Sequence, residues 1–201
     1  MSSASPFEDL TEFAVAVDEL GMDRALADIE GAARVVRPIL ELGRRQRFDS
    51  LLASIRAARE AGTYTEVALN SVEGYRVLVG GLHDEAPTVP KAVSLLDYAG
   101  FRLSVLASSE TPDWVSIRVT MEQARGFWAS IAMRVENKGL RDAMNTTIDG
   151  IEHAVSAPSI NRLQRTALRV AAEPERHTEY FTCNMIPLDV SLIVALEVSY
   201  E

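Results

Sequence analysis

Three side chains that could hold a divalent cation lie close together near residue 150. Asp149, Glu152 and His153 are spaced so that, in a helix, they share one side. Carboxylates and imidazoles are common metal ligands, so this spacing permits a metal site and a metal-dependent reaction. No complementary set of ligands is apparent on another segment, and the same residues are typical of a solvated polar helix face. The metal site therefore remains one alternative, and we expect no bound cofactor.

A second group that could bind a ligand is a run of arginines, which consists of Arg34, Arg37, Arg44, Arg45 and Arg47. Asp49 follows as a candidate helix cap, and Arg44, Arg45 and Arg47 would then lie near a helix N-terminus. Guanidinium charge, free backbone donors and the helix dipole together favour a phosphate or carboxylate, which predicts an anion site. An acidic segment, residues 8–30, precedes the run. Mutual neutralisation of the two segments, within a chain or between subunits, is the alternative interpretation.

The cysteine and the tryptophans do not indicate a reaction. Cys183, the only cysteine, has no base beside it in the sequence and lies in a segment rich in strand formers, which suits a structural thiol. Trp114 and Trp128 could line a ligand pocket, but their spacing is that of residues in a packed helix core. The chain lacks a Walker loop, a dinucleotide-binding fingerprint, a nucleophile elbow and a kinase signature. We therefore expect a protein that is not an enzyme.

Composition excludes several classes of protein and partner. With 47% hydrophobic and 24% charged residues among 201, the chain has the balance of an ordinary folded protein with one main domain. A formal net charge of −9 argues against nucleic acid and anionic membranes as partners. One cysteine excludes an intramolecular disulfide, and no apolar run is long enough to span a membrane. We expect a cytoplasmic protein that does not bind a membrane.

Apolar residues recur three and four positions apart through most of the chain, which predicts about seven helices. The first begins at Pro6 and ends at Gly21, and the second begins near Asp23. Pro38 should bend or split that second helix because proline removes a backbone donor and clashes with the preceding turn. Gly43 should end it, and later helices are expected to start near residues 48, 64, 90, 113, 140 and 159.

The helix after Asp113 has the cleanest periodicity in the chain. Its apolar positions are Trp114, Ile117, Met121, Ala124, Trp128, Ile131 and Val135. Alternating spacings of three and four are typical of a helix packed at a shallow angle inside a bundle. Residues 137–139 are expected to cap its C-terminus. We predict a mainly α fold, a multi-helix bundle over residues 1–176.

The last residues follow a different pattern. On one face of the alternation lie Val190, Leu192, Val194, Leu196, Val198 and Tyr200. A period of two predicts a β-strand with one apolar face, and residues 180–186 could pair with it in a hairpin. A short helix is the competing interpretation, because several of these residues are good helix formers. We predict a small C-terminal β element over residues 177–201, packed on the bundle or on a partner chain.

These patterns favour a non-enzymatic assembly or protein-interaction module. In that hypothesis the C-terminal strand pairs with another chain by β-augmentation, so that the partner is a protein and the module forms a homo-oligomer or a larger assembly. The alternative is a helical ligand-binding or sensor domain, with a pocket beside the helix that carries Trp114 and Trp128. The second alternative is the metal-dependent enzyme considered above.

Overall fold

The computed structural model describes residues 6–81, 90–109 and 111–156, together with Ser159, Ile160, Gln164 and Ala167. The ranges hold seven α-helices and two short 3₁₀ helices, and no strand occurs within them. The helices are α1 (Pro6–Ala16), α2 (Glu19–Val36), η1 (Arg37–Ile39), α3 (Leu42–Glu60), α4 (Tyr64–Gly81), α5 (Lys91–Ser108), α6 (Trp114–Ile131), η2 (Ala132–Arg134) and α7 (Lys138–Ser156). The prediction of a mainly helical protein is confirmed. The predicted strand and hairpin, and the boundary at residue 177, lie outside the described residues.

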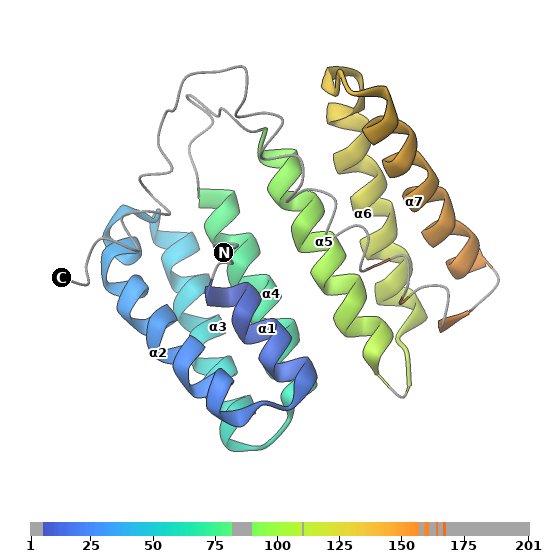
Figure 1. Cartoon of the computed structure of the whole chain (residues 1–201). Helices are drawn as coiled ribbons and strands as arrows, with labels where there is room; N and C mark the ends of the chain where they lie inside the picture. The colour runs from blue at the N-terminus through green and yellow to red at the C-terminus, as the bar shows by residue number, and fades with distance from the viewer. Residues whose placement is uncertain are drawn as a thin grey trace. The chain divides into compact units, whose positions relative to one another are not determined.

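The described helices form two compact units, one with α1 to α4 and one with α5 to α7 (Figure 1). In the first unit α1 packs on α2 and α4, and α4 also packs on α3. None of the helices in the described ranges is both long and apolar enough to cross a bilayer.

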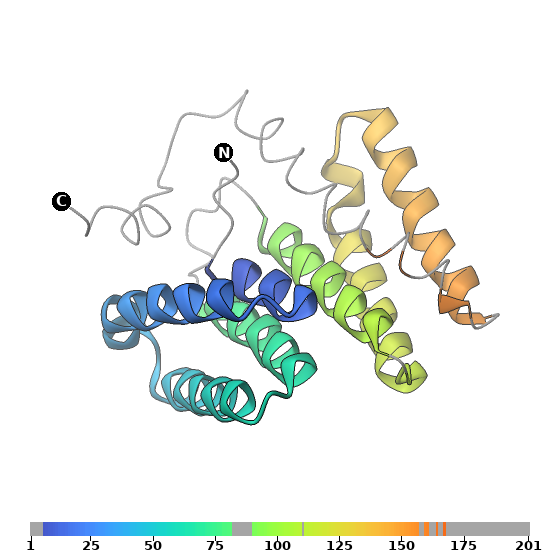
Figure 2. The same ribbon diagram turned by 60° about the horizontal axis from the view of Figure 1, so that its bottom comes forward.

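Phe7 lies at the centre of the core of the first unit. Its ring contacts the edge of Phe48 on α3, with 6.0 Å between centroids, and lies so close to Gly74 on α4 that a β-carbon there would overlap it. The Phe7 carbonyl accepts hydrogen bonds from Thr11, at 2.7 Å, and from buried Ser71, also at 2.7 Å. The Thr11 bond lies within α1, whereas the buried Ser71 hydroxyl is satisfied only when α1 packs beside α4 (Figure 2).

Two helices of this unit end in the same backbone motif. Beyond α3, Gly62 has φ +69° and its amide donates to the Arg59 carbonyl. The Thr63 amide donates to the Ala58 carbonyl at 2.9 Å. Beyond α1, Val17 has φ +59° and Asp18 donates to the Phe13 carbonyl at 2.9 Å. Both are Schellman turns, which require a left-handed residue just after the helix. Valine is a strained choice for that position, because its branched β-carbon crowds the backbone.

The first predicted helix boundary was therefore wrong. The chain breaks at Val17, and Gly21 lies inside α2. Its small size serves packing, because a β-carbon on Gly21 would lie 2.6 Å from the Phe13 ring and 2.7 Å from the Asp18 carboxylate. That carboxylate caps α2 by accepting a hydrogen bond from the Gly21 amide at 3.0 Å.

Pro38 splits the second predicted helix, as expected, because α2 ends at Val36 and Pro38 lies in η1. The prediction for Gly43 was wrong. Residue 43 lies in the first turn of α3, which begins at Leu42 rather than near Phe48. A β-carbon at residue 43 would meet no atom within 4 Å, so no close contact requires a glycine there.

In the second unit α6 packs against α5 and α7. The predicted seam of α6 is confirmed, since its members from Ile117 to Val135 are buried and Trp114 is half-buried. Asp113 caps α6 by accepting from the amides of Val115 and Ser116, and hydrogen bonds from Ser116 hold the pKa of Asp113 below its ordinary value. The predicted C-cap at residues 137–139 was wrong. Asn137 instead accepts from the Leu140 amide at 3.1 Å, at the start of α7, because the chain has already left α6 through η2.

Candidate functional site

The predicted metal ligands lie on α7. Asp149 and His153 are exposed, and Glu152 faces Arg125 of α6 with 3.7 Å between Oε1 and Nη1. Within the ranges that the structure describes, no three His, Cys, Asp or Glu side chains are grouped as a metal site would require. In the structure Glu152 therefore pairs with an arginine, and not with further metal ligands.

A ladder of ion pairs joins α2 to α3, which run antiparallel. Arg37 contacts Asp49 at 2.6 Å. Glu30 contacts Arg56 at 2.7 Å, and Asp23 contacts Arg59 at 3.1 Å. The acidic segment was a candidate to neutralise the arginine run, but the ladder pairs its acids differently. The acids of α2 are paired mainly with arginines from the second half of α3, outside the run.

The ladder ends in a denser group, which we call the network end: Glu19, Asp23, Arg59 and Tyr64. Arg59 donates to Asp23 and lies 3.5 Å from Glu19, and its guanidinium carbon lies 6.0 Å from the centre of the Tyr64 ring. The Tyr64 hydroxyl donates to Glu19 in turn. This hydrogen bond, with smaller effects of desolvation and of the charge on Glu19, raises the pKa of the Tyr64 hydroxyl. Every charged group at this end has a partner inside the unit.

The three arginines predicted to bind an anion have different surroundings. Arg44 lies against the C-terminal turn of α4, so close to Gly80 that a β-carbon there would collide with Nη1. Positive charge is favourable at that position because the carbonyl end of a helix carries partial negative charge. Arg45 donates to the Leu40 carbonyl at 3.2 Å. Arg47 is exposed and has no ion pair within the described ranges. The structure does not show the three side chains gathered around one point.

An exposed surface remains where α2, η1 and α3 meet. We call it the basic–apolar corner and define it as Arg34, Val35, Ile39, Leu42 and Arg47. The side chains of the three apolar members are exposed, at 46% for Val35, 59% for Ile39 and 68% for Leu42. Arg34 is exposed like Arg47, and within the described ranges neither has an acidic partner. The five residues belong to the last turn of α2, to η1 and to the first turns of α3, which follow one another directly in the chain.

The start of α3 adds backbone donors to this corner. Its N-cap residue, Glu41, makes no side-chain hydrogen bond to the helix, and its first turn holds no acidic residue. The first amides of a helix lack partners within the helix and carry partial positive charge. The corner therefore combines apolar contact area with positive charge from Arg34, Arg47 and the backbone. The one carboxylate between its members in the sequence, that of Glu41, lies 3.9 Å from the Arg44 guanidinium. Such a surface suits a partner that is apolar and acidic.

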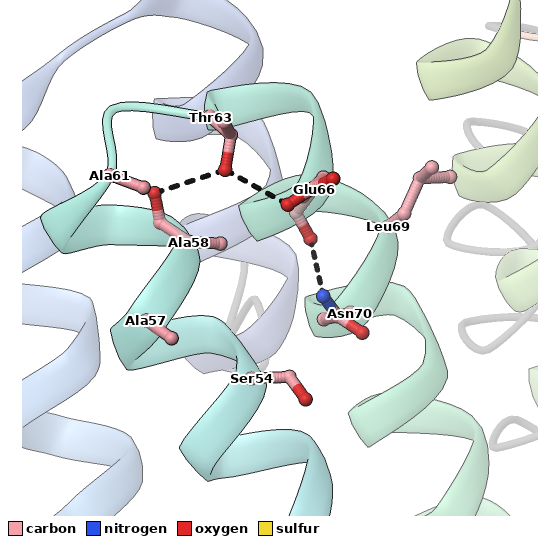
Figure 3. Close-up of a pocket in the computed structure, with 8 residues that line it drawn as sticks. All are labelled: Ser54, Ala57, Ala58, Ala61, Thr63, Glu66, Leu69 and Asn70. Carbon is pink, nitrogen blue, oxygen red and sulfur yellow. Dashed lines mark hydrogen bonds between the residues drawn. The ribbon is translucent and has the colours of Figure 1, made fainter.

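A shallow groove of about 620 Å³ lies between α3 and α4 (Figure 3). It is lined by Ser54, Ala57, Ala58, Ala61, Thr63, Glu66, Leu69 and Asn70. Among the polar residues in the close-up, Thr63, Glu66 and Asn70 are joined by hydrogen bonds, whereas no dashed line joins Ser54 to another residue drawn. Thr63 donates to the Ala58 carbonyl and contacts Glu66 at 3.0 Å, and Asn70 donates to the Glu66 carbonyl at 2.9 Å. The groove therefore lacks the convergent polar groups that orient a small ligand.

The second unit carries a smaller set of exposed apolar side chains. Val115 and Val119 lie one turn apart on α6, and Met133 lies in η2 with 89% of its surface exposed. Trp128 is buried and its indole donates to Asn145 at 2.7 Å, so it belongs to the core. The predicted pocket beside the two tryptophans stays a prediction.

No protein-family model matches this chain, and neither the curated proteins nor the solved structures include one that is detectably similar to it.

Sequence reasoning found the arginines of the corner but missed its apolar members. Val35, Ile39 and Leu42 lie off the apolar stripes that predicted the helices. Because the stripes account for core-facing residues, apolar residues left over between them are the signal that could have indicated an exposed surface. The predicted interaction residues at 190–200 lie outside the described residues.

Proposed function

We propose that this protein is a non-enzymatic protein-interaction module that assembles with further copies of itself through residues 187–201. The observation that carries the proposal is the alternation of apolar residues from Val190 to Tyr200. A segment with one apolar face gains stability by burying that face, in strand pairing or against another apolar surface. Its charged residues, Asp189, Glu197 and Glu201, are all acidic, which adds a preference for a basic partner.

The described surfaces support this function. The basic–apolar corner exposes three large aliphatic side chains together, whereas isolated exposed apolar residues are ordinary on protein surfaces. Apolar side chains rimmed by arginine are typical of protein-binding sites, in which arginine is enriched and lysine is depleted. The chain itself contains only two lysines among its 20 basic residues.

A pair of matched variants of the full chain tests the proposal. Leu192→Asp with Leu196→Asp places two charges on the apolar face, and Ser191→Asp with Ala195→Asp places the same charges on the opposite face. Because each buried leucine contributes about 1.5–3 kcal/mol, the first variant should weaken self-association by a factor on the order of a hundred or more. The second should associate nearly as the unmodified protein does.

Light scattering and sedimentation over a concentration series measure the effect, and circular dichroism checks that both variants stay helical. An unmodified protein that remains monomeric at every concentration would overturn the proposal. So would equal association of the two variants.

A further inference from the structure

We propose that the basic–apolar corner is the docking site for residues 187–201 of a second copy of this chain. The inference rests on the proposed function, and it names the surface that receives the segment. The chain would then carry both halves of one contact, a helical corner and a separate apolar segment.

The charges of the two halves are complementary. Arg34 and Arg47 are exposed at the corner without acidic partners in the described ranges, and the first amides of α3 add positive potential. Residues 187–201 contain Asp189, Glu197 and Glu201 and no lysine or arginine. In a chain with a net charge of −9, two negative surfaces would repel each other, so a local basic surface is where an acidic segment can bind.

The apolar parts are complementary as well. Val35, Ile39 and Leu42 lie between the two arginines in the sequence, and all three are substantially exposed. The segment offers Val190, Leu192, Val194, Leu196, Val198 and Tyr200 on one face. Burial of the aliphatic side chains would supply affinity, while the arginines at the rim would orient the acidic segment.

Four other surfaces of the described residues fit this segment less well. The exposed side chains of Val15, Val17 and Leu20 surround Asp18 and Glu19 in the sequence, which would repel an acidic segment. The network end has its acids and its arginine paired with each other. The groove between α3 and α4 is lined by small side chains and by Glu66, which would repel an acidic segment. The exposed valines of α6 lie beside Arg118 but also precede Glu122, so their surroundings are of mixed charge.

The geometry of such a contact differs from that of strand pairing between equal segments. A segment that binds a different surface on the next copy makes a head-to-tail contact, which grows into a ring or an open chain. Two identical segments that pair with each other make a symmetric dimer and stop. A reciprocal exchange of segments also closes at two copies, so variants of the corner, and not the mass of the assembly, distinguish the two modes.

The decisive experiment is a charge exchange in the full chain. Arg34→Glu with Arg47→Glu should weaken self-association by about tenfold or more, because it replaces two attractions with two repulsions. The matched control is Arg24→Glu with Arg118→Glu, two exposed arginines that are not members of the corner and that change the net charge equally. Adding Asp189→Arg and Glu197→Arg to the corner variant should restore association.

An apolar pair of variants gives a second measurement that is independent of charge. Ile39→Asn with Leu42→Asn should weaken association, and Val115→Asn with Val119→Asn should leave it nearly unchanged. All four positions are exposed, so the fold should survive, and circular dichroism with thermal unfolding checks that it does. Sedimentation over a concentration series measures association in every case.

The outcomes separate this inference from the proposed function. If the Leu192→Asp, Leu196→Asp variant loses association while both corner variants keep it, the segment binds elsewhere, and the corner inference fails while the proposed function stands. A charge exchange that does not restore association also overturns the inference. If the segment variant itself associates normally, both proposals fail.

Discussion

The two ends of the α2–α3 pair use the same residue types in opposite ways. At the network end, Arg59 is shared between Asp23 and Glu19, and the Tyr64 hydroxyl binds Glu19. At the other end, Arg34 and Arg47 have no acidic partner in the described ranges, although the chain as a whole is acidic. An excess of acid in the chain therefore does not neutralise every arginine, because the helix register decides which charges can meet.

The backbone shows the same contrast. At the network end α1 and α3 finish in complete Schellman turns, and α2 starts with the Asp18 cap. At the corner α3 starts without a side-chain cap, and its neighbouring apolar side chains face solvent. Apolar side chains are exposed at both ends, with Val17 and Leu20 at the network end and Val35, Ile39 and Leu42 at the corner. The two ends therefore differ in their charge pairing and helix caps, and not in apolar exposure.

The largest expected effect concerns the core that joins the two ends. Phe48→Ala removes the ring that packs against Phe7, and it should lower the free energy of unfolding by about 3–5 kcal/mol. Hydrogen exchange should then show faster exchange in α1, α3 and α4 together. Loss of protection at only one end would show that the two ends unfold separately, which would contradict a core shared between them. Met133→Ala, at an exposed position, is the control.

The next effect distinguishes the two left-handed turn residues at the network end. Gly62→Val should destabilise the fold by about 1–2 kcal/mol, because a branched side chain is strained at positive φ. Val17→Gly should be neutral or stabilising by up to about 1 kcal/mol, because Val17 is already strained there and 56% exposed. Chemical denaturation measures both changes. Destabilisation by Val17→Gly would mean that the valine side chain contributes packing that outweighs its strain.

Helix caps provide a smaller test of the contrast between the ends. Asp18→Ala should cost about 1 kcal/mol of stability, because it removes the hydrogen bond to the Gly21 amide. Glu41→Ala should cost much less, because Glu41 makes no such bond at the start of α3. Urea unfolding of the two variants gives the comparison. Equal costs would contradict the description of the corner as an uncapped helix start.

Arginine truncation should have a smaller effect still. Arg59→Met should destabilise the protein by about 0.5 kcal/mol, since exposed ion pairs are screened by solvent. Arg47→Met should leave stability within about 0.5 kcal/mol of the unmodified value or raise it, because no internal partner is lost. A larger loss of stability for Arg47→Met than for Arg59→Met would show that Arg47 makes a stabilising contact within the fold.

Titration of Tyr64 gives the finest test of the network end. Its raised pKa means that the folded state favours the protonated hydroxyl. This contribution to stability is full below the ordinary pKa of 10.0 and is lost as the pH rises through the higher pKa of the folded protein. Ultraviolet titration of the protein and of Tyr64→Phe should differ by one tyrosine that ionises above its ordinary pKa. Glu19→Gln should move that ionisation toward the ordinary value, and an unmoved ionisation would contradict the assigned cause.

Much of the fold was predictable because its signals are local. The start of α1 at Pro6, the break at Pro38 and the buried seam of α6 follow from proline chemistry and from the period of 3.6 residues. Glycine was the less reliable signal. Gly62 ends a helix through its left-handed backbone, whereas Gly21 and Gly74 exist for close contacts with Phe13 and Phe7 that no local pattern reveals.

The candidate surface was predictable only in part. The arginine run predicted positive charge near a helix start, and α3 does begin among those arginines. That Arg44 would lie against α4 and Arg45 would bind the Leu40 carbonyl depends on how the helices pack. The leftover apolar residues of the corner were visible in the sequence, but their exposure was not.

The sequence by itself determined the helices, most of their buried faces and the acidic apolar segment near residue 190. These properties depend on neighbours within about seven positions, so periodicity and turn chemistry are sufficient to indicate them. The tertiary structure alone decided which arginines meet acids and which remain exposed. Ion pairs such as Arg59 with Asp23 join residues 36 positions apart. Their formation depends on the register between antiparallel helices, which an amphipathic pattern does not encode.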